Sequence, residues 1–346
     1  MPDEQRMLAI LKGDAHGAGP SLLRCGLRAV EPLYAGVTGI RNKLFDAGLK
    51  RARKLGRPTI SVGNITTGGT GKTPIVQWLV EQLIAQGHRP AVLLRGYRAS
   101  EGHSDEASLY RRIEGLEVEA DPDRIAAARR VLARAPQTSV FLLDDAFQHR
   151  RAARDLDIVL IDATNPFGFE HVLPRGLLRE PLRGLARADV LIITRVHDRA
   201  DALRQRLRAL NPIAPILSCR HVITGLRDEH DQPAPLPQRA IAIAGIGNPM
   251  AFFEQLETEL GIPLTQTIAL PDHHAYDAAA LARIRSAAPN GTAVITTEKD
   301  WVKLARTDHG LLLLRAALKI DFADGDALAL LQAVATDTTS DKMGKV

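Results

Sequence analysis

The segment GNITTGGTGKTP, residues 63–74, most constrains the fold, because a strand pattern enters it and a helix pattern leaves it. Residues 58–62 predict a buried strand, and the apolar residues of 75–84 fall on one helical face. Glycines let backbone N–H groups curl around a polyphosphate, Lys72 supplies a positive charge, and the Thr73 hydroxyl can ligate Mg²⁺. The segment therefore predicts a P-loop and a chain that handles a nucleoside triphosphate.

One position of this loop departs from the general pattern, which has Gly five residues before Gly71, where this chain has Thr66. The tail GGTGKT compensates for that departure. A glycine-rich turn with a chance lysine is the alternative interpretation. We expect the nucleotide phosphates to be bound by Thr66, Thr67, Gly68, Gly69, Thr70, Gly71, Lys72 and Thr73.

Composition narrows the class of protein. The 346 residues carry 45 basic and 40 acidic side chains, a net charge of +5, and only two cysteines. No zinc-finger spacing, RNA-binding aromatic signature or long basic tract is present, so nucleic acid is not implied, and a nucleotide plus an anionic lipid accounts for the same sign of charge. The distant pair Cys25 and Cys219 predicts neither a disulfide framework nor a cysteine metal site.

The first fifty residues raise the question of a membrane. No apolar run approaches the roughly 20 residues that span a bilayer, and no secretory leader is recognisable, so we expect a cytoplasmic protein. Residues 21–49 mix apolar and basic side chains and predict an amphipathic helix, which either packs on a core or lies on a membrane surface. The basic residues that follow favour anionic lipid: Lys50, Arg51, Arg53, Lys54 and Arg57.

Strand and helix patterns alternate after the loop. Continuous apolar runs at 91–94, 140–143, 157–161 and 190–193 are typical of strands buried on both faces of a parallel sheet, and the pattern predicts an α/β/α sandwich. A polar, proline-rich stretch at 211–239 is the expected boundary. Beyond it, strand patterns restart at 241–244 and 293–296, and helical patterns cover 249–260 and 278–287. We expect a P-loop core domain at 1–218, with the N-terminal helix, and a smaller α/β domain at 219–346 that closes the nucleotide cleft.

The apolar run at 140–143 ends in two acids, Asp144 and Asp145. A carboxylate at the C-terminal end of such a strand can reach Mg²⁺ near Thr73 and the phosphates, which is where α/β sheets bind ligands. Hydrophobic strands also end in Asp simply to start a turn. Behind a P-loop, the two acids predict a metal site.

Several motifs in one order carry a family resemblance. The string DDAFQHRRAARDLDIVLIDA, together with GNITTGGTGKTP, closely resembles the tetraacyldisaccharide 4'-kinases, the lipid A 4'-kinases of Gram-negative bacteria. The match continues at RGY (95–97), SDE (104–106), LPRGLLREPL (173–182), GIGNP (245–249), DHH (272–274) and ITTEKD (295–300). Small departures touch loop geometry: Ala146 stands where Gly is usual, Ala107 where Pro is usual, and Arg98 where Gly is frequent.

The resemblance implies phosphoryl transfer from ATP to the 4'-hydroxyl of a tetraacylated glucosamine disaccharide 1-phosphate, which forms lipid IVA in lipid A synthesis. It also implies Mg²⁺ as cofactor and a peripheral position on the cytoplasmic face of the inner membrane. No obligate protein partner is evident. These expectations agree with the chemistry, since a sugar hydroxyl is a poor nucleophile and needs a base, a metal and cations on the triphosphate.

The resemblance also implies the catalytic residues. An Asp105–His273 pair would take the proton of the acceptor hydroxyl and share the resulting charge. Lys72 would hold the β- and γ-phosphates, and Thr73, Asp144 and Asp145 would serve the metal directly or through water. Glu106 is either a supporting metal carboxylate or a solvated acid. His149 either orients a loop or substrate, or has a structural role.

Two other classes of protein compete. A P-loop GTPase or metallochaperone would need a guanine-recognition loop and metal-binding Cys or His clusters, and the order Thr-Glu-Lys-Asp at 297–300 has the wrong spacing for such a loop. That stretch either faces the nucleotide cleft or starts a helix capped by Thr297. A membrane-attached ATP-binding regulator would need no base. Three arginines in and directly after LPRGLLREPL suit the substrate's 1-phosphate or lipid headgroups, or simply the solvent: Arg175, Arg179 and Arg183.

Overall fold

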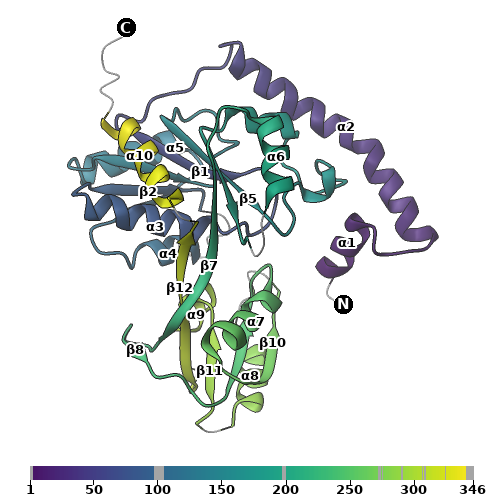
Figure 1. Ribbon diagram of the computed structural model, residues 1–346, viewed down its shortest axis with the longest axis vertical. Coiled ribbons are helices and arrows are strands. Elements are labelled where there is room, and N and C mark those ends of the chain that lie inside the picture. The colour runs from purple at the N-terminus through teal and green to yellow at the C-terminus, as the bar shows by residue number, and fades with distance from the viewer. Residues whose placement is uncertain are drawn as a thin grey trace. The chain divides into compact units, whose positions relative to one another are not determined.

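The computed structural model of the chain describes residues 3–96, 105–196, 200–271, 274, 276–289, 291–305, 307, 309–323 and 325–339, with the side chains of 3–5, 105, 106 and 335–339 excepted. The chain divides into two compact units (Figure 1). Unit 1 contains residues 1–95, 114–220 and 322–346, and unit 2 contains residues 96–113 and 221–321. Each unit is therefore discontinuous in sequence.

Unit 1 is built on a parallel sheet in the order β3-β2-β4-β1-β5-β6-β7. The strands of this sheet are β1 (Thr59–Asn64), β2 (Pro90–Leu94), β3 (Glu117–Ala120), β4 (Val140–Asp144), β5 (Leu156–Asp162), β6 (Val190–Thr194) and β7 (Ile216–Arg227), the last of which continues into unit 2. Its helices are α1 (Asp3–Lys12), α2 (Ala18–Asp46), α3 (Lys72–Ala85), α5 (Arg124–Arg134), η1 (Gly168–Glu170), η2 (Leu182–Arg187), α6 (Asp201–Leu210) and α10 (Asp326–Thr339).

Helices cover both faces of this sheet, and every residue of its central strands β1, β4, β5 and β6 is buried. On one face, Phe141 and Leu143 of β4 pack with α5, and Val159 and Ile161 of β5 pack in one cluster with Leu207 of α6. Helix α3 contacts β1, β2 and β4, and α10 contacts β5. Successive side chains of a strand point to opposite faces, so two covered faces require continuous apolar runs.

Unit 2 is a smaller α/β layer structure. Its parallel strands run in the order β10-β9-β11-β12, and β8 pairs antiparallel with β7. The elements are α4 (Asp105–Tyr110), β8 (Pro233–Ala234), β9 (Ala240–Ala244), α7 (Pro249–Leu260), β10 (Leu264–Ala269), α8 (Ala278–Ala287), β11 (Ala293–Thr296), α9 (Glu298–Leu304) and β12 (Leu312–Phe322). Alternate residues of β9 pack with α7 and with α8, so helices again cover both faces.

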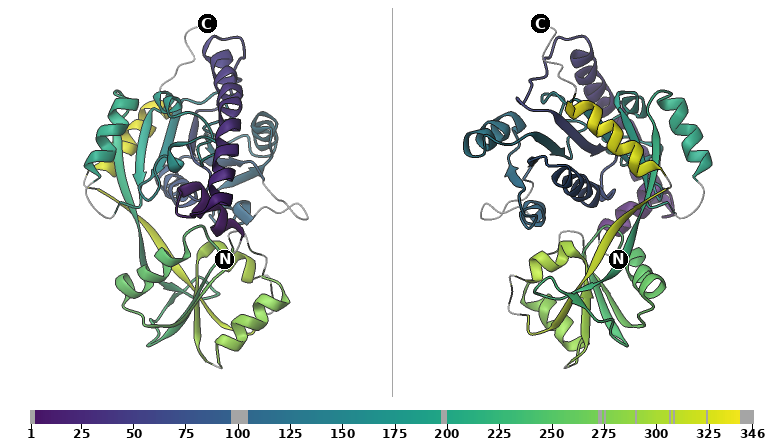
Figure 2. Two further views of the ribbon diagram at one scale, coloured as in Figure 1. Left: turned by 90° about the vertical axis from the view of Figure 1, so that its right-hand side faces the viewer. Right: turned by 60° about the vertical axis from the view of Figure 1, so that its left-hand side comes forward.

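The 29-residue helix α2 has two different faces. On one face, Tyr34 donates a hydrogen bond to the Arg179 carbonyl at 3.0 Å, and Glu31 accepts one from the Val172 N–H at 3.1 Å, so this face packs on unit 1. The other face is an apolar stripe of Leu22, Val30, Leu33, Val37 and Ile40, all exposed. Their spacing of three, four or eight residues puts them on one side of the helix. Figure 2 shows α2 running along unit 1.

Within the described residues, no helix is long and apolar enough to cross a bilayer.

The predicted α/β/α sandwich with a smaller α/β part and an N-terminal amphipathic helix is confirmed. The predicted helix at 278–287 has the same bounds in α8, and α5 begins after Asp123, whose side chain caps it. The proline-rich stretch 211–239 contains the long strand β7, which the sequence pattern did not predict. The division into domains at 1–218 and 219–346 stays a prediction.

Gly63 generates a test of how β1 packs. A Cβ added there would lie 2.7 Å from both the backbone nitrogen and the Cβ of Phe147, and a backbone atom cannot move aside cheaply. We expect Gly63→Ala to lower the stability of unit 1 by about 1–3 kcal/mol, measured as a lower thermal unfolding midpoint. Gly225→Ala in β7 is the matched strand control, since nothing lies within 4 Å of its added Cβ. Equal midpoints for both variants would contradict this close packing of β1.

Candidate active site

The loop between β1 and α3 has the geometry of a phosphate-binding turn. Gly68 and Gly71 have φ values of +104° and +82°, a conformation that favours glycine, and Gly71 is the residue before the first turn of α3. A Cβ added at Gly68 or Gly69 would meet nothing within 4 Å, so their backbone faces open space. The N-terminal N–H groups of a 14-residue helix and the adjacent glycines fit a polyphosphate.

The structure explains why Thr66 can replace the first glycine of the pattern. Thr66 is not among the residues with positive φ and forms an antiparallel bridge with Leu178. The pairing is extended by the Thr67 N–H, which donates to the Leu177 carbonyl at 2.7 Å, and by the Arg179 N–H, which donates to the Ile65 carbonyl at 2.7 Å. The start of the loop is thus paired with residues 177–179 without a positive φ at Thr66, so glycine is not needed there.

The end of β4 lies beside this loop, because β4 pairs in parallel with β1. Asp145 Oδ1 lies 3.4 Å from Lys72 Nζ, and Arg179 Nη1 donates to both carboxylate oxygens of Asp145 at 2.7 and 2.9 Å. Burial raises the pKa of Asp145, but the charges of Lys72 and Arg179 outweigh that effect and the net pKa is lowered. Asp145 is therefore a stable anion next to the predicted phosphate site.

Asp144 occupies the last position of β4 and is 4 % exposed. The backbone carbonyl of Asp144 accepts a hydrogen bond at 3.1 Å from Arg124, whose guanidinium is buried at the start of α5. The structure therefore places three predicted residues, Lys72, Asp144 and Asp145, at one edge of the parallel sheet. Thr73 follows Lys72 in the first turn of α3.

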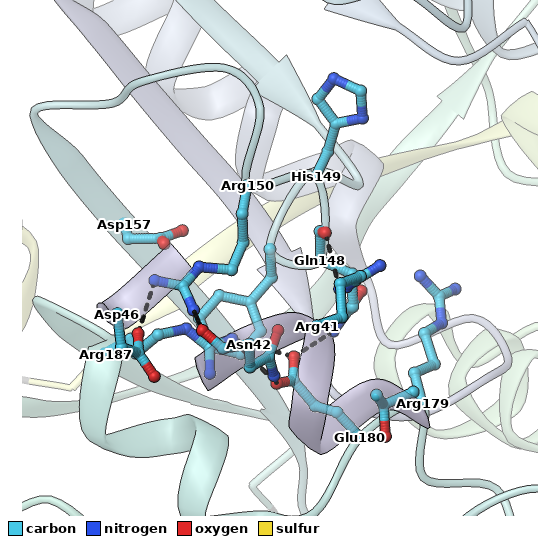
Figure 3. Close-up of polar contacts among 12 residues, drawn as sticks. Arg41, Asn42, Asp46, Gln148, His149, Arg150, Asp157, Arg179, Glu180 and Arg187 are labelled. Carbon is cyan, nitrogen blue, oxygen red and sulfur yellow. Dashed lines mark hydrogen bonds and ion pairs between the residues drawn. The ribbon is translucent and has the colours of Figure 1, made fainter. Parts of the chain in front are cut away.

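A buried carboxylate that the sequence did not single out lies next to this site. Glu180 accepts hydrogen bonds from Asn42 at 2.8 Å, from Gln148 at 3.0 Å and from Arg187 at 2.9 and 3.0 Å (Figure 3). Gln148 also donates to the Asn64 carbonyl at 2.9 Å. The only sequence signal for Glu180 is its place in the motif LPRGLLREPL.

The arginines predicted to meet a substrate phosphate make intramolecular contacts. Arg175 donates to the Leu11 carbonyl at 2.8 Å and Arg179 pairs with Asp145. The guanidinium of Arg183 packs against Gly39 of α2, where a Cβ would lie only 2.7 Å from Arg183 Nη2. These side chains therefore contribute to holding α1, α2 and Asp145 in place.

His149 lies in the turn after β4 with its Nε2 buried and no hydrogen-bond partner for that atom among the described residues. Burial, reinforced by the charges of Arg124, Arg154 and Arg151, lowers the pKa of His149 from 6.5 to about 4. The ring is therefore neutral at pH 7. A neutral ring packed among arginines is consistent with the structural role as well as with orientation of the loop.

The predicted proton-transfer residues fall partly outside the described part of the chain. Asp105 and Glu106 begin α4 of unit 2, but their side chains are not among those described, and His273 lies outside the described residues. The 296–300 stretch starts helix α9, where Thr297 caps the Asp300 N–H at 3.2 Å and Asp300 accepts the Gly245 N–H at 2.8 Å. This is the helix-start interpretation of that stretch.

No cluster of three or more His, Cys, Asp or Glu that could hold a metal ion occurs among the residues that the structure describes. Mg²⁺ bound with substrate phosphates usually takes only one or two carboxylates and keeps several waters. Asp145 and the Thr73 hydroxyl are oxygen donors of the type that Mg²⁺ prefers. The residues at the edge of the sheet thus fit an ATP–Mg²⁺ complex.

The lowered pKa of His149 predicts a pH-dependent stability. Because the folded-state pKa of about 4 lies below 6.5, the unfolded chain binds the proton more strongly, so stability is full above pH 6.5 and falls as the pH falls toward 4. We expect His149→Gln to flatten this part of the curve of thermal midpoint against pH. His16→Gln, at an exposed histidine, is the control and should leave the curve unchanged. Identical slopes for His149→Gln and the wild type would refute the assignment.

Comparison with known proteins identifies the family. The family described as Tetraacyldisaccharide-1-P 4'-kinase matches residues 23–336. The tetraacyldisaccharide 4'-kinase of Geobacter sulfurreducens is 35% identical over 320 residues, which cover 86% of this chain and 88% of the relative. That of Pelobacter propionicus is 38% identical over 323 residues, with 84% and 87% covered.

A solved structure agrees over nearly the whole chain. The "apo" form of LpxK from Aquifex aeolicus, in complex with ATP, superposes with a TM-score of 0.73 at 26% identity and covers 91% of this chain and 99% of its own. The resemblance seen in the sequence motifs is therefore confirmed by family, relatives and fold together. This chain belongs to the tetraacyldisaccharide-1-P 4'-kinase family.

Proposed function

We propose that this protein transfers the γ-phosphoryl group of ATP to the 4'-hydroxyl of a tetraacyldisaccharide 1-phosphate, giving lipid IVA in lipid A synthesis. The observation that carries the proposal is the contact of Lys72 with Asp145 at 3.4 Å, beside a P-loop, in a member of this family. A lysine for the phosphates and a carboxylate for the metal are the two charges that phosphoryl transfer needs next to each other.

In this proposal, the triphosphate is held by the Lys72 ammonium and by backbone N–H groups of the loop at 66–73, other than the Thr67 N–H, which donates to the Leu177 carbonyl. Mg²⁺, when bound, supplies positive charge that offsets the charge developing on the phosphoryl oxygens. Thr73, Asp144 and Asp145 would hold that ion directly or through water, with Glu106 as a further candidate. Arg179 keeps Asp145 ionised and fixed in direction by bonding both of its oxygens.

The acceptor hydroxyl needs a proton acceptor. We assign this role to Asp105 and His273, by their place in the motifs SDE and DHH. Their proposed partnership rests on the family resemblance and on the chemistry of a carboxylate that orients a histidine. A regulator that binds ATP without catalysis would not depend on either residue, so these two positions separate the kinase from that alternative.

The lipid character of the substrate agrees with helix α2. Its exposed apolar stripe is followed by the exposed basic residues Lys50, Arg51, Arg53 and Lys54. An apolar face beside clustered cations suits an anionic bilayer surface. We propose that α2 rests on the cytoplasmic face of the inner membrane and that the protein takes its substrate from there, as a peripheral protein.

The direct test measures transfer of labelled phosphate from ATP to a detergent-dispersed tetraacyldisaccharide 1-phosphate in the presence of Mg²⁺. We expect transfer by the wild type and a loss of about 10²-fold or more in kcat for Lys72→Ala, since an aimed cation at the phosphates is removed. Lys54→Ala, which removes an exposed cation away from the P-loop, is the control and should keep full activity in detergent.

Absence of lipid phosphorylation by a wild-type protein that binds ATP would overturn the proposal. Asp105→Ala and His273→Ala sharpen the result. Each should lower kcat by about 10²-fold or more while ATP binding is kept, because a general base contributes on that scale. Two silent variants would favour a non-catalytic ATP-binding protein.

The membrane proposal has its own test. The triple variant Leu33→Ser, Val37→Ser and Ile40→Ser should reduce sedimentation with vesicles that contain anionic lipid, because apolar burial at the interface is lost. The matched control changes three exposed apolar residues away from the stripe, Ile213, Leu236 and Leu328, to Ser. If both triple variants bind vesicles like the wild type, α2 is not the membrane contact.

A further inference from the structure

Glu180 is an unusual carboxylate, because it is completely buried and its side chain is surrounded by hydrogen-bond donors. Its exposed fraction is 0 %, and four N–H···O contacts of 2.8–3.0 Å reach its two oxygens. Burying a charge is costly unless it is paired and hydrogen-bonded. One arginine, Arg187, supplies the opposite charge. The amides of Asn42 and Gln148 supply the further hydrogen bonds and in doing so tie Glu180 to two other segments.

These two amides come from segments that are distant in sequence. Asn42 lies near the end of α2, and Gln148 lies in the turn after β4, three residues beyond Asp145. Gln148 is held a second time by α2, because Arg41 donates to its backbone carbonyl at 3.0 Å (Figure 3). The amide of Gln148 also reaches the carbonyl of Asn64, whose side-chain oxygen lies 3.4 Å from Lys72 Nζ.

The residue before Glu180 completes the connection. Arg179 bonds both oxygens of Asp145 with its side chain, while its backbone carbonyl accepts the Tyr34 hydroxyl of α2 at 3.0 Å. The backbone alternates, so Arg179 reaches toward the phosphate site while Glu180 points into the buried cluster. The pair Arg179–Glu180 thus joins helix α2 to Asp145 and Lys72 through contacts at every step.

The surrounding packing is shaped for this carboxylate. A Cβ added at Gly184 would lie 2.5 Å from Glu180 Oε2, so glycine is needed to let the η2 backbone approach. Arg187 lies over the ring of Phe147, at 4.5 Å from its centre, which fixes the guanidinium that pairs with Glu180. The Glu180 carboxylate is therefore held from several sides.

We propose that Glu180 is a positioning residue for phosphoryl transfer, which sets the turn carrying Asp145 by tying Gln148 to Asn42. The C-terminal turns of α2 then belong to the framework of the active site, in addition to the proposed membrane contact of its other face. This inference rests on the proposed kinase activity. The inference goes beyond the proposed kinase activity, because it assigns a function to residues that contact neither the nucleotide nor the acceptor.

Because Glu180 is surrounded by hydrogen-bond donors, one substitution tests its role directly. Glu180→Gln keeps the size of the side chain, but turns one acceptor oxygen into an NH₂ group that must face a donor. Adding Asn42→Asp supplies a new acceptor for that NH₂ group, so the double variant restores the Asn42–Glu180 contact with donor and acceptor exchanged and the total charge unchanged. A framework role predicts rescue by this exchange.

The experiment compares the wild type, Glu180→Gln, Asn42→Asp, and the double variant in the detergent lipid-kinase assay, with kcat referred to the concentration of ATP-binding sites. We expect Glu180→Gln to lower kcat about tenfold or more, with the ATP dissociation constant within about threefold of the wild type, and the double variant to recover most of the loss. Vesicle sedimentation of all four proteins should match the wild type, because the stripe is unchanged.

Asp155→Asn is the control for loss of stability alone. Asp155 accepts the Thr59 N–H at 2.9 Å at the opposite, N-terminal edge of the sheet, so this variant should unfold more easily and keep its kcat. If Glu180→Gln does not fold, Asn42→Ala replaces it and should lower kcat in the same way.

Unchanged kcat in Glu180→Gln, or a loss in that variant that Asn42→Asp does not rescue, would overturn the inference. The inference also fails if the loss of kcat only parallels the fall in thermal midpoint seen with Asp155→Asn. A wild type that transfers no phosphate to lipid would instead defeat the proposed function, so the two failures are distinguishable.

Discussion

The parallel pairing of β1 with β4 on one side and β5 on the other is the constraint on which the rest of unit 1 depends. Parallel strands end at the same edge of a sheet, so the loop after β1 and the acids at the end of β4 lie next to each other. The pairing also buries both faces of the sheet, which requires helices on each. In β1, β4, β5 and β6, charged side chains therefore occur only near the strand ends. Lys72 and Asp145 are in contact for this reason.

The charges at that edge of the sheet affect the protonation of Asp145 and His149 in different ways. Asp145 is held as an anion by Lys72 and Arg179, whereas His149 is held neutral by burial and by arginines around it. In both cases cations surround the turn after β4: Lys72 and Arg179 lie at Asp145, and Arg124, Arg151 and Arg154 lie near His149. A site that receives a polyanion benefits from such cations, because they are present before the ligand arrives and need no reorganisation.

The sequence predicted the parts of the fold that have a strong period. The apolar strands β4, β5 and β6 and the helix α8 were recognisable, because buried parallel strands and capped helices have distinct patterns. Strand β7 was missed, since its burial alternates irregularly through residues such as Ser218, His221 and Gly225. At the site, sequence motifs predicted Lys72 and Asp145. The role of Glu180 depends on contacts with Asn42 and Gln148, which are 138 and 32 residues away in the sequence, so no local pattern reveals it.

The discontinuity of unit 1 has a consequence for synthesis on the ribosome. Helix α10 contacts β5, and its Leu330 and Val334 are buried, yet α10 starts at Asp326, 164 positions after the end of β5 at Asp162. The nucleotide-binding unit cannot cover that face of its sheet until residues 326–339 have emerged. At an elongation rate of about 5–20 residues per second, the apolar face of β5 stays uncovered for many seconds until α10 is synthesised. Chaperones can bind this exposed face during that time.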